Sequence, residues 1–113
     1  MKKTETLKKN YEFKNIFLKG KYFSGKYIEV FYLKTNKKHN NIGIAIGTKI
    51  TKAVGRNKIK RLIRENYRLK ENELKVGYDI IFLWKKNQNI SNANYYNIKE
   101  DMDFIFNKIG IKK

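Results

Sequence analysis

All four arginines of this chain lie between Lys52 and Lys70, whereas every other basic residue in the 113-residue sequence, apart from a single histidine, is a lysine. A guanidinium group presents five N–H donors in a fixed plane. It therefore grips phosphate through two bonds and stacks on nucleic-acid bases, which an ammonium group does not do. Arginine confined to one stretch of a lysine-rich chain thus indicates a site that binds phosphate groups or bases.

The same stretch has the period of an amphipathic helix, which we expect from about residue 54 to residue 69. At 100° per residue one sector of this helix is apolar and contains Ile59, Leu62, Ile63 and Tyr67. The adjoining sector contains Arg56, Asn57, Lys60, Arg61, Arg64 and Arg68. Between Thr48 and Lys70 there are nine basic residues and one acid, Glu65. A merely solvated helix would alternate acids with bases, so this sector is predicted to bind a polyanion.

The start of this helix offers a second means of binding phosphate. Gly55 permits close approach to the backbone, and Arg56 and Asn57 lie in the first turn, where free N–H groups attract anions.

The net charge of the chain favours nucleic acid as the partner. There are 27 basic and 10 acidic residues, which gives +17 at pH 7. An excess of that size on a small domain indicates a polyanionic partner. No membrane partner is expected, because no amphipathic helix of the interfacial type is present. DNA is not expected either, because a strand precedes the arginine-rich helix where a helix-turn-helix would need another helix. The N-terminus has no apolar signal region, so we expect the protein in the cytoplasm.

A self-contained nuclease site is not expected in this chain. His39 is the single histidine, so no His–His acid/base pair exists, and it is predicted to lie in an exposed turn. Glu100, Asp101 and Asp103 form the only acidic cluster and are expected to be solvated on the outer side of a helix. There is no cysteine, so disulfides and thiolate metal sites are excluded. No catalytic residue and no metal held by the protein are predicted.

The chain as a whole is predicted to be one RNA-binding domain over residues 1–113, with residues 1–9 as a loose basic arm. A first helix is expected from Asn10, its N-cap, to about Leu18, with Gly20 ending it. A short extended segment follows, then strands over 27–34 and 42–50, expected to pair as an antiparallel hairpin. Gly43, Ala45 and Gly47 leave one face of the second strand open for another backbone or a ligand. A strand over 78–85, apolar on both faces, is expected at the centre, and a last helix over 94–109. This order predicts an α+β sandwich.

The segment "GRNKIKRLIRENYR" resembles the RNR motif of the protein subunit of bacterial ribonuclease P. The similarity extends to "LKKNYEFKNIFLKGK", to the two strands before the motif, and to "YDIIFLW" after it. It therefore covers nearly the whole chain. The resemblance implies an αβββαβα sandwich of the ribosomal S5 domain 2-like type, with a mostly antiparallel sheet and a left-handed βαβ crossover. One departure is Lys58, which stands at the second arginine of the Arg-Asn-Arg triplet and keeps the charge without the bidentate geometry.

The resemblance also implies a function and its residues. The protein subunit binds the catalytic RNA of ribonuclease P and the 5′ leader of precursor tRNA, and the RNA, with its own bound Mg²⁺, makes the mature 5′ end. The implied contacts with the catalytic RNA are Arg56, Asn57, Lys58, Lys60, Arg61, Arg64 and Arg68. The implied leader cleft contains Phe13, Phe17 and Phe31, aromatic residues suited to stacking on unpaired bases. Taken without the resemblance, the charge and the α+β pattern also fit a small ribosomal or other rRNA-binding protein.

Overall fold

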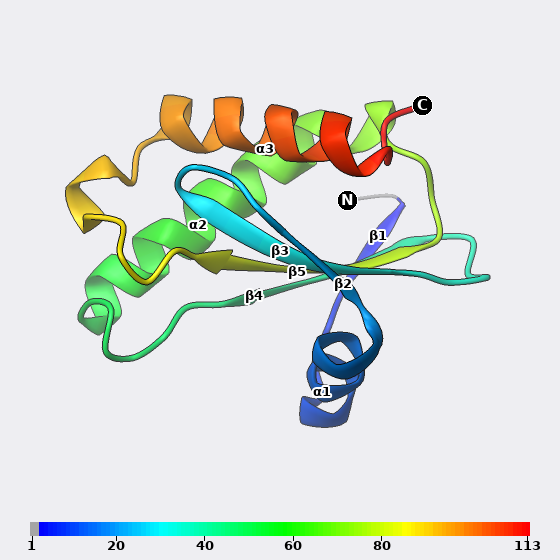
Figure 1. The fold of residues 1–113 in the computed structure, drawn as a ribbon, viewed down its shortest axis with the longest axis horizontal. Helices are drawn as coiled ribbons and strands as arrows, with labels where there is room; N and C mark the ends of the chain where they lie inside the picture. The colour runs from blue at the N-terminus through cyan, green and yellow to red at the C-terminus, as the bar shows by residue number, and fades with distance from the viewer. Residues whose placement is uncertain (1–2) are drawn as a thin grey trace.

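The computed structural model describes residues 3–113. The chain forms one five-stranded sheet with α1 on one face and α2 and α3 on the other (Figure 1). In chain order the elements are β1 (Thr4–Thr6), α1 (Asn10–Lys19), β2 (Lys21–Ser24), β3 (Ile28–Lys34), β4 (Asn40–Ala45), α2 (Ala53–Lys70), β5 (Tyr78–Trp84) and α3 (Tyr95–Ile109). Short 3₁₀ helices cover Glu71–Glu73 and Ile90–Asn92. From α1 onward this is the predicted αβββαβα order.

The sheet has the order β1-β4-β5-β3-β2, so β5 is central, as its apolar residues on both faces predicted. β5 pairs antiparallel with β3 and parallel with β4. The predicted hairpin between β3 and β4 is therefore wrong, and so is the extension of β4 beyond Ala45. In β5 the side chains of Ile80, Ile81 and Phe82 are fully buried. Because β5 must be covered on both faces, it lies between β3 and β4. β1 pairs parallel with β4 and β2 antiparallel with β3, so the sheet is mixed.

The N-terminal segment is packed against the sheet, so the prediction of a loose arm is wrong for its described part; residues 1–2 lie outside the described residues. Thr4 is buried, and its hydroxyl lies 2.7 Å from the hydroxyl of Tyr67 on α2. Leu7 is buried under α1, and its backbone N–H donates to the carbonyl of Ile42. The lysines of this segment predicted that it would be solvated. The burial of Thr4 and Leu7 instead fixes the segment against the sheet.

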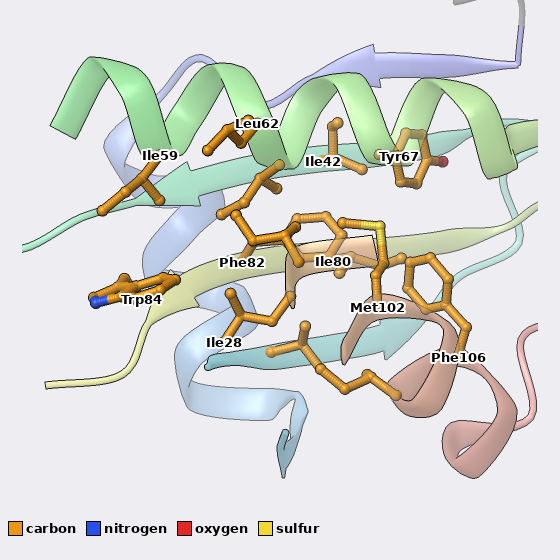
Figure 2. Packing of buried hydrophobic residues seen from close by; sticks show 14 of the residues in the cluster. Ile28, Ile42, Ile59, Leu62, Tyr67, Ile80, Phe82, Trp84, Met102 and Phe106 are labelled. Atoms are coloured by element: carbon orange, nitrogen blue, oxygen red, sulfur yellow. The ribbon is translucent and has the colours of Figure 1, made fainter. Parts of the chain in front are cut away.

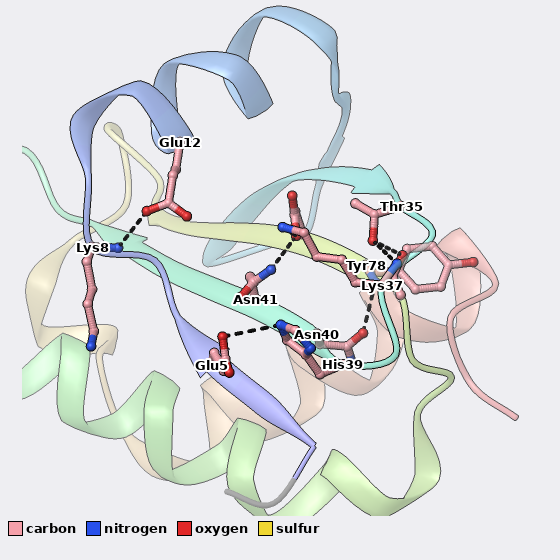
Figure 3. Close-up of polar contacts among 11 residues, drawn as sticks. Glu5, Lys8, Glu12, Thr35, Lys37, His39, Asn40, Asn41 and Tyr78 are labelled. Atoms are coloured by element: carbon pink, nitrogen blue, oxygen red, sulfur yellow. Dashed lines mark hydrogen bonds and ion pairs between the residues drawn. The ribbon is translucent and has the colours of Figure 1, made fainter.

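The N-cap of α1 is Lys9, one residue before the predicted cap, Asn10. The carboxylate of Glu12 accepts from the backbone N–H groups of Lys9, at 3.0 Å, and Lys8, at 3.3 Å (Figure 3). These backbone bonds hold the pKa of Glu12 below its usual value. Gly20 ends the helix as predicted, because a Cβ there would lie 2.6 Å from the carbonyl oxygen of Ile16.

The main core lies between the sheet and the pair α2 and α3. Figure 2 shows Tyr67 of α2 and Phe106 of α3 around Phe82 of β5, each ring within 6.4 Å of the next, centre to centre. The opposite face of the sheet has only the ten-residue α1 over it, and its buried cluster is limited to Leu7, Ile16 and Ile81. Because so short a helix cannot cover a five-stranded sheet, aromatic side chains beside α1 remain partly exposed.

The acidic cluster on α3 is not the solvated surface that the sequence predicted. Asp101 is buried and accepts from the backbone N–H groups of Lys26, Tyr27 and Ile28 at 2.7–2.8 Å. The turn before β3 leaves these three donors without strand partners, and one carboxylate satisfies them all. Asp103 lies 2.8 Å from the ammonium group of Lys70. Burial opposes its ionisation, but the hydrogen bonds and charges of Lys70 and Lys112 together outweigh burial and lower the pKa of Asp103. Asp103 is half-buried, and of the three acids only Glu100 is exposed.

His39 lies between β3 and β4, about one third exposed, with Nε2 3.3 Å from a carboxylate oxygen of Glu5 (Figure 3). Within residues 3–113 no three His, Cys, Asp or Glu side chains gather as a metal site would require. No helix in that range is both long and apolar enough to span a bilayer.

Candidate nucleic-acid interface

α2 divides into the two sectors predicted from its sequence. Ile59, Ile63 and Tyr67 are fully buried against the sheet and α3. The polar sector together with Lys58, which the resemblance added, is here called the arginine face and contains Arg56, Asn57, Lys58, Lys60, Arg61, Arg64 and Arg68. Within it Arg56 and Lys60 are half-buried and the other five side chains are exposed. The packed sector therefore fixes the helix on the protein, and the arginine face is directed toward solvent.

No carboxylate neutralises the arginine face. The ion pairs within 4.0 Å among residues 3–113 involve Lys37, His39, Lys70 and Lys112, and none involves an arginine. Arg61, Arg64 and Arg68 line one open hollow together with Glu65. Three guanidinium groups thus converge on one surface with their donors free for an external anion.

Arg56 is arranged differently from the other three arginines. Its Nη1 donates to the carbonyl oxygen of Thr51 at 2.7 Å and reaches that of Thr48 at 3.5 Å. Thr51 also requires a glycine at position 55, because a Cβ there would lie 2.4 Å from Oγ1 of Thr51. The close approach that Gly55 allows is thus made by Thr51, and Arg56 holds the loop between β4 and α2 against the first helical turn.

The three predicted cleft residues lie together between α1 and the sheet. Phe17 and Phe31 pack edge to face with ring centres 5.0 Å apart. Phe13 lies deeper, because its ring fills the space over Gly43, where a Cβ would lie 2.5 Å from the ring. The open face predicted for β4 is therefore occupied at this position by α1. Phe17 is 38% exposed, so it is more available to a ligand than Phe13.

Tyr22 belongs to the same group, although its sequence context did not predict this. It stands opposite Phe31 in the β2–β3 register, with ring centres 5.2 Å apart, and it is 51% exposed. We call Phe13, Phe17, Phe31 and Tyr22 the aromatic cleft. The only sequence signal for Tyr22 was an aromatic residue in a short strand, and its significance depends on the pairing with β3.

A wide hollow of about 570 Å³ lies beside the aromatic cleft. Its lining includes Ala45 and Leu83, which pack on the same small cluster as Phe13 and Phe31. Its lining also includes Lys49 from the loop that Arg56 holds, Lys86 after β5, and Glu29 on β3. Because Glu29 lines this hollow and is hydrogen-bonded to Tyr22, the hollow and the aromatic cleft adjoin.

The arginine face and the aromatic cleft are neighbours. Lys60 and Arg64 of α2 line a smaller hollow of about 180 Å³ that also contains Phe13 and Gly43. A polyanion bound along α2 is thereby adjacent to aromatic side chains beside α1. Phosphate-binding groups next to stacking groups are the combination that single-stranded nucleic acid requires.

Comparisons with known proteins agree with this geometry. The family model described as ribonuclease P matches residues 1–110. The ribonuclease P protein component of Dictyoglomus turgidum is 40% identical over 111 residues, covering 98% of this chain and 93% of the relative. The solved RNase P protein of Thermotoga maritima superposes with a TM-score of 0.83 at 26% identity, covering 92% of this chain and 96% of that protein. The Staphylococcus aureus RNase P protein gives 0.81 at 27% identity, covering 96% and 97%. A family match over nearly the whole chain, with the same fold in solved members, establishes that this chain belongs to the ribonuclease P protein family.

Proposed function

We propose that this chain is the protein component of a ribonuclease P ribonucleoprotein, in which it binds the catalytic RNA through the arginine face. The aromatic cleft and its hollow then bind the single-stranded 5′ leader of precursor tRNA. The observation that carries the proposal is the continuity of these surfaces through the hollow shared by Lys60, Arg64 and Phe13. Family membership supports an RNA partner and a role in tRNA 5′ processing.

In this proposal the RNA carries out cleavage with its own bound Mg²⁺, and the protein supplies binding and electrostatic support. His39 is engaged with Glu5, and Asp101 with three backbone amides, so neither is placed to act on a ligand in the aromatic cleft. A chain of charge +17 reduces phosphate repulsion between the catalytic RNA and its substrate. Such a particle would act in the cytoplasm.

The deciding experiment is a reconstitution at low Mg²⁺. Catalytic RNA and a precursor tRNA are combined with and without the protein, and release of the 5′ leader is followed over time. We expect the protein to restore cleavage at the mature 5′ end. An Arg61→Ala, Arg64→Ala, Arg68→Ala variant should restore little, whereas Lys99→Ala, an exposed change on α3, should behave like the natural chain.

The same experiment separates the proposal from the rRNA-binding alternative. A protein that serves only ribosomal RNA would bind the catalytic RNA no better than unrelated RNA of equal length, and would leave cleavage unchanged at every Mg²⁺ concentration. That result would reject the proposed function.

A further inference from the structure

The hollow beside the aromatic cleft contains one carboxylate, that of Glu29, among its described lining residues. Lys49 and Lys86 line the same hollow, yet no basic group in residues 3–113 lies within 4.0 Å of Glu29. A negative group in a surface built for RNA repels the phosphate backbone. Glu29 is therefore suited to a part of the RNA other than phosphate.

Glu29 is tied to the aromatic cleft through Tyr22. The Tyr22 hydroxyl donates to Oε2 of Glu29 across the β2–β3 pair. This bond to Glu29 also raises the pKa of the phenol. The bond restrains both side chains: the half-exposed Tyr22 ring is presented beside Phe31, and the carboxylate is presented at the edge of that ring.

The base edges of RNA differ in how well they suit a carboxylate, which accepts hydrogen bonds and donates none. Guanine has two adjacent donors, N1–H and N2–H, which match the two oxygens. Uracil has one N–H between two carbonyl oxygens, which a carboxylate repels. Cytosine and adenine each have one amino donor beside a ring acceptor. A base stacked on Tyr22 brings its edge toward Glu29, and unpaired bases are commonly read at that edge.

We propose that Glu29, oriented by Tyr22, is a specificity-determining residue that selects guanine at one position of the single-stranded leader. The remaining aromatic contacts are indifferent to sequence, since every base has a face on which to stack. This inference rests on the proposed function, because it requires a leader strand in the aromatic cleft.

The test uses the reconstituted particle and precursor tRNAs whose leaders are uridine throughout except for one guanosine, moved along the leader. For the natural chain we expect one position at which guanosine tightens binding roughly fivefold or more over uridine. Inosine there, which lacks the 2-amino group, should restore only part of that gain. Glu29→Gln should remove the guanosine preference while binding the all-uridine leader as well as, or better than, the natural chain.

Glu100→Gln is the matched control, because Glu100 is an exposed carboxylate on α3, on the opposite face of the sheet. It should keep the guanosine preference, and the melting temperatures of all variants should match. If no position favours guanosine, or if Glu29→Gln keeps the preference, the inference is wrong. If precursors with any leader bind no better than mature tRNA, the proposed leader cleft fails first, and the two failures are thereby distinguished.

Discussion

The arginines of α2 differ in what occupies their donors. Arg56 uses Nη1 on the carbonyl oxygen of Thr51, whereas Arg61, Arg64 and Arg68 face an open hollow with no bonded carboxylate. At the scale of single residues the chemistry offered to RNA is therefore that of three planar, bidentate donors. Charge alone does not describe it, since lysines are abundant elsewhere on the chain.

Replacing Arg61 and Arg64 together by lysine tests this geometry at constant charge. We expect the affinity for the catalytic RNA to fall roughly fivefold, about 1 kcal/mol, because an ammonium group cannot make the paired bonds of a guanidinium. Filter binding at moderate salt measures it. Because the charge is unchanged, the salt dependence should stay the same, and an unaltered affinity would contradict the role of guanidinium.

Phe17 tests the aromatic cleft with little disturbance of the fold, because it is partly exposed and packs mainly on Phe31. Phe17→Ala should weaken binding of leader-bearing precursor by about 1–3 kcal/mol, the contribution of one stacked base. Binding of mature tRNA should not change.

Phe13→Ala is a less clean probe, since the ring also fills the space over Gly43 and its loss would destabilise the fold. An equal loss of affinity for precursor and mature tRNA in the Phe17 variant would reject the cleft assignment.

At the scale of elements, the short β2–β3 pair presents Tyr22 and Phe31, and α3 holds that pair in place. The link is Asp101, whose carboxylate accepts three backbone N–H groups at the turn before β3. α1 completes the surface from the other side but covers little of it. The cleft thus depends on an anchor that lies on the opposite side of the sheet.

Asp101→Ala should lower the free energy of unfolding by about 3 kcal/mol or more, because three buried donors lose their acceptor together. Urea denaturation followed by circular dichroism measures this loss. Glu100→Ala, the adjacent exposed acid, should change stability by less than about 0.5 kcal/mol. Equal effects of the two substitutions would show that the turn does not need its carboxylate.

At the scale of the whole molecule, a net charge of +17 on 113 residues makes association with RNA depend on counterion release. The small hollow at Phe13 shares Arg64 with the hollow of the arginine face and includes residues 42–44 of β4, and the wide hollow includes Ala45 at the end of the same strand. RNA held at one of them is near the next, so the surface is expected to act as a unit.

Removing the charges of Arg61, Arg64 and Arg68 by alanine should reduce the slope of log affinity against log salt by about 2–3, since each lost phosphate contact contributes about 0.7–0.9. The slope is measured by titration at several potassium concentrations. Replacing Lys99, Lys108 and Lys113 by alanine removes the same amount of charge outside both surfaces. This change should leave the slope nearly unchanged. A similar reduction for both sets would mean that only total charge matters.

The sequence by itself determined those features that repeat locally along the chain. The two sectors of α2 follow from a 3.6-residue period, and the central place of β5 follows from apolar residues on both its faces. The RNR-like segment and the three phenylalanines Phe13, Phe17 and Phe31 were recognisable for the same reason, because residue types at fixed spacing are visible without a fold.

Only the tertiary structure decided which distant segments meet. Four features join segments whose own patterns admit several partners. They are the pairing of β3 with β5 instead of β4, the strand at Thr4–Thr6, the burial of Asp101 and the contact of Tyr22 with Glu29. Such choices depend on the competition among all strands and side chains for the same buried places, a property of the whole assembly rather than of any one stretch.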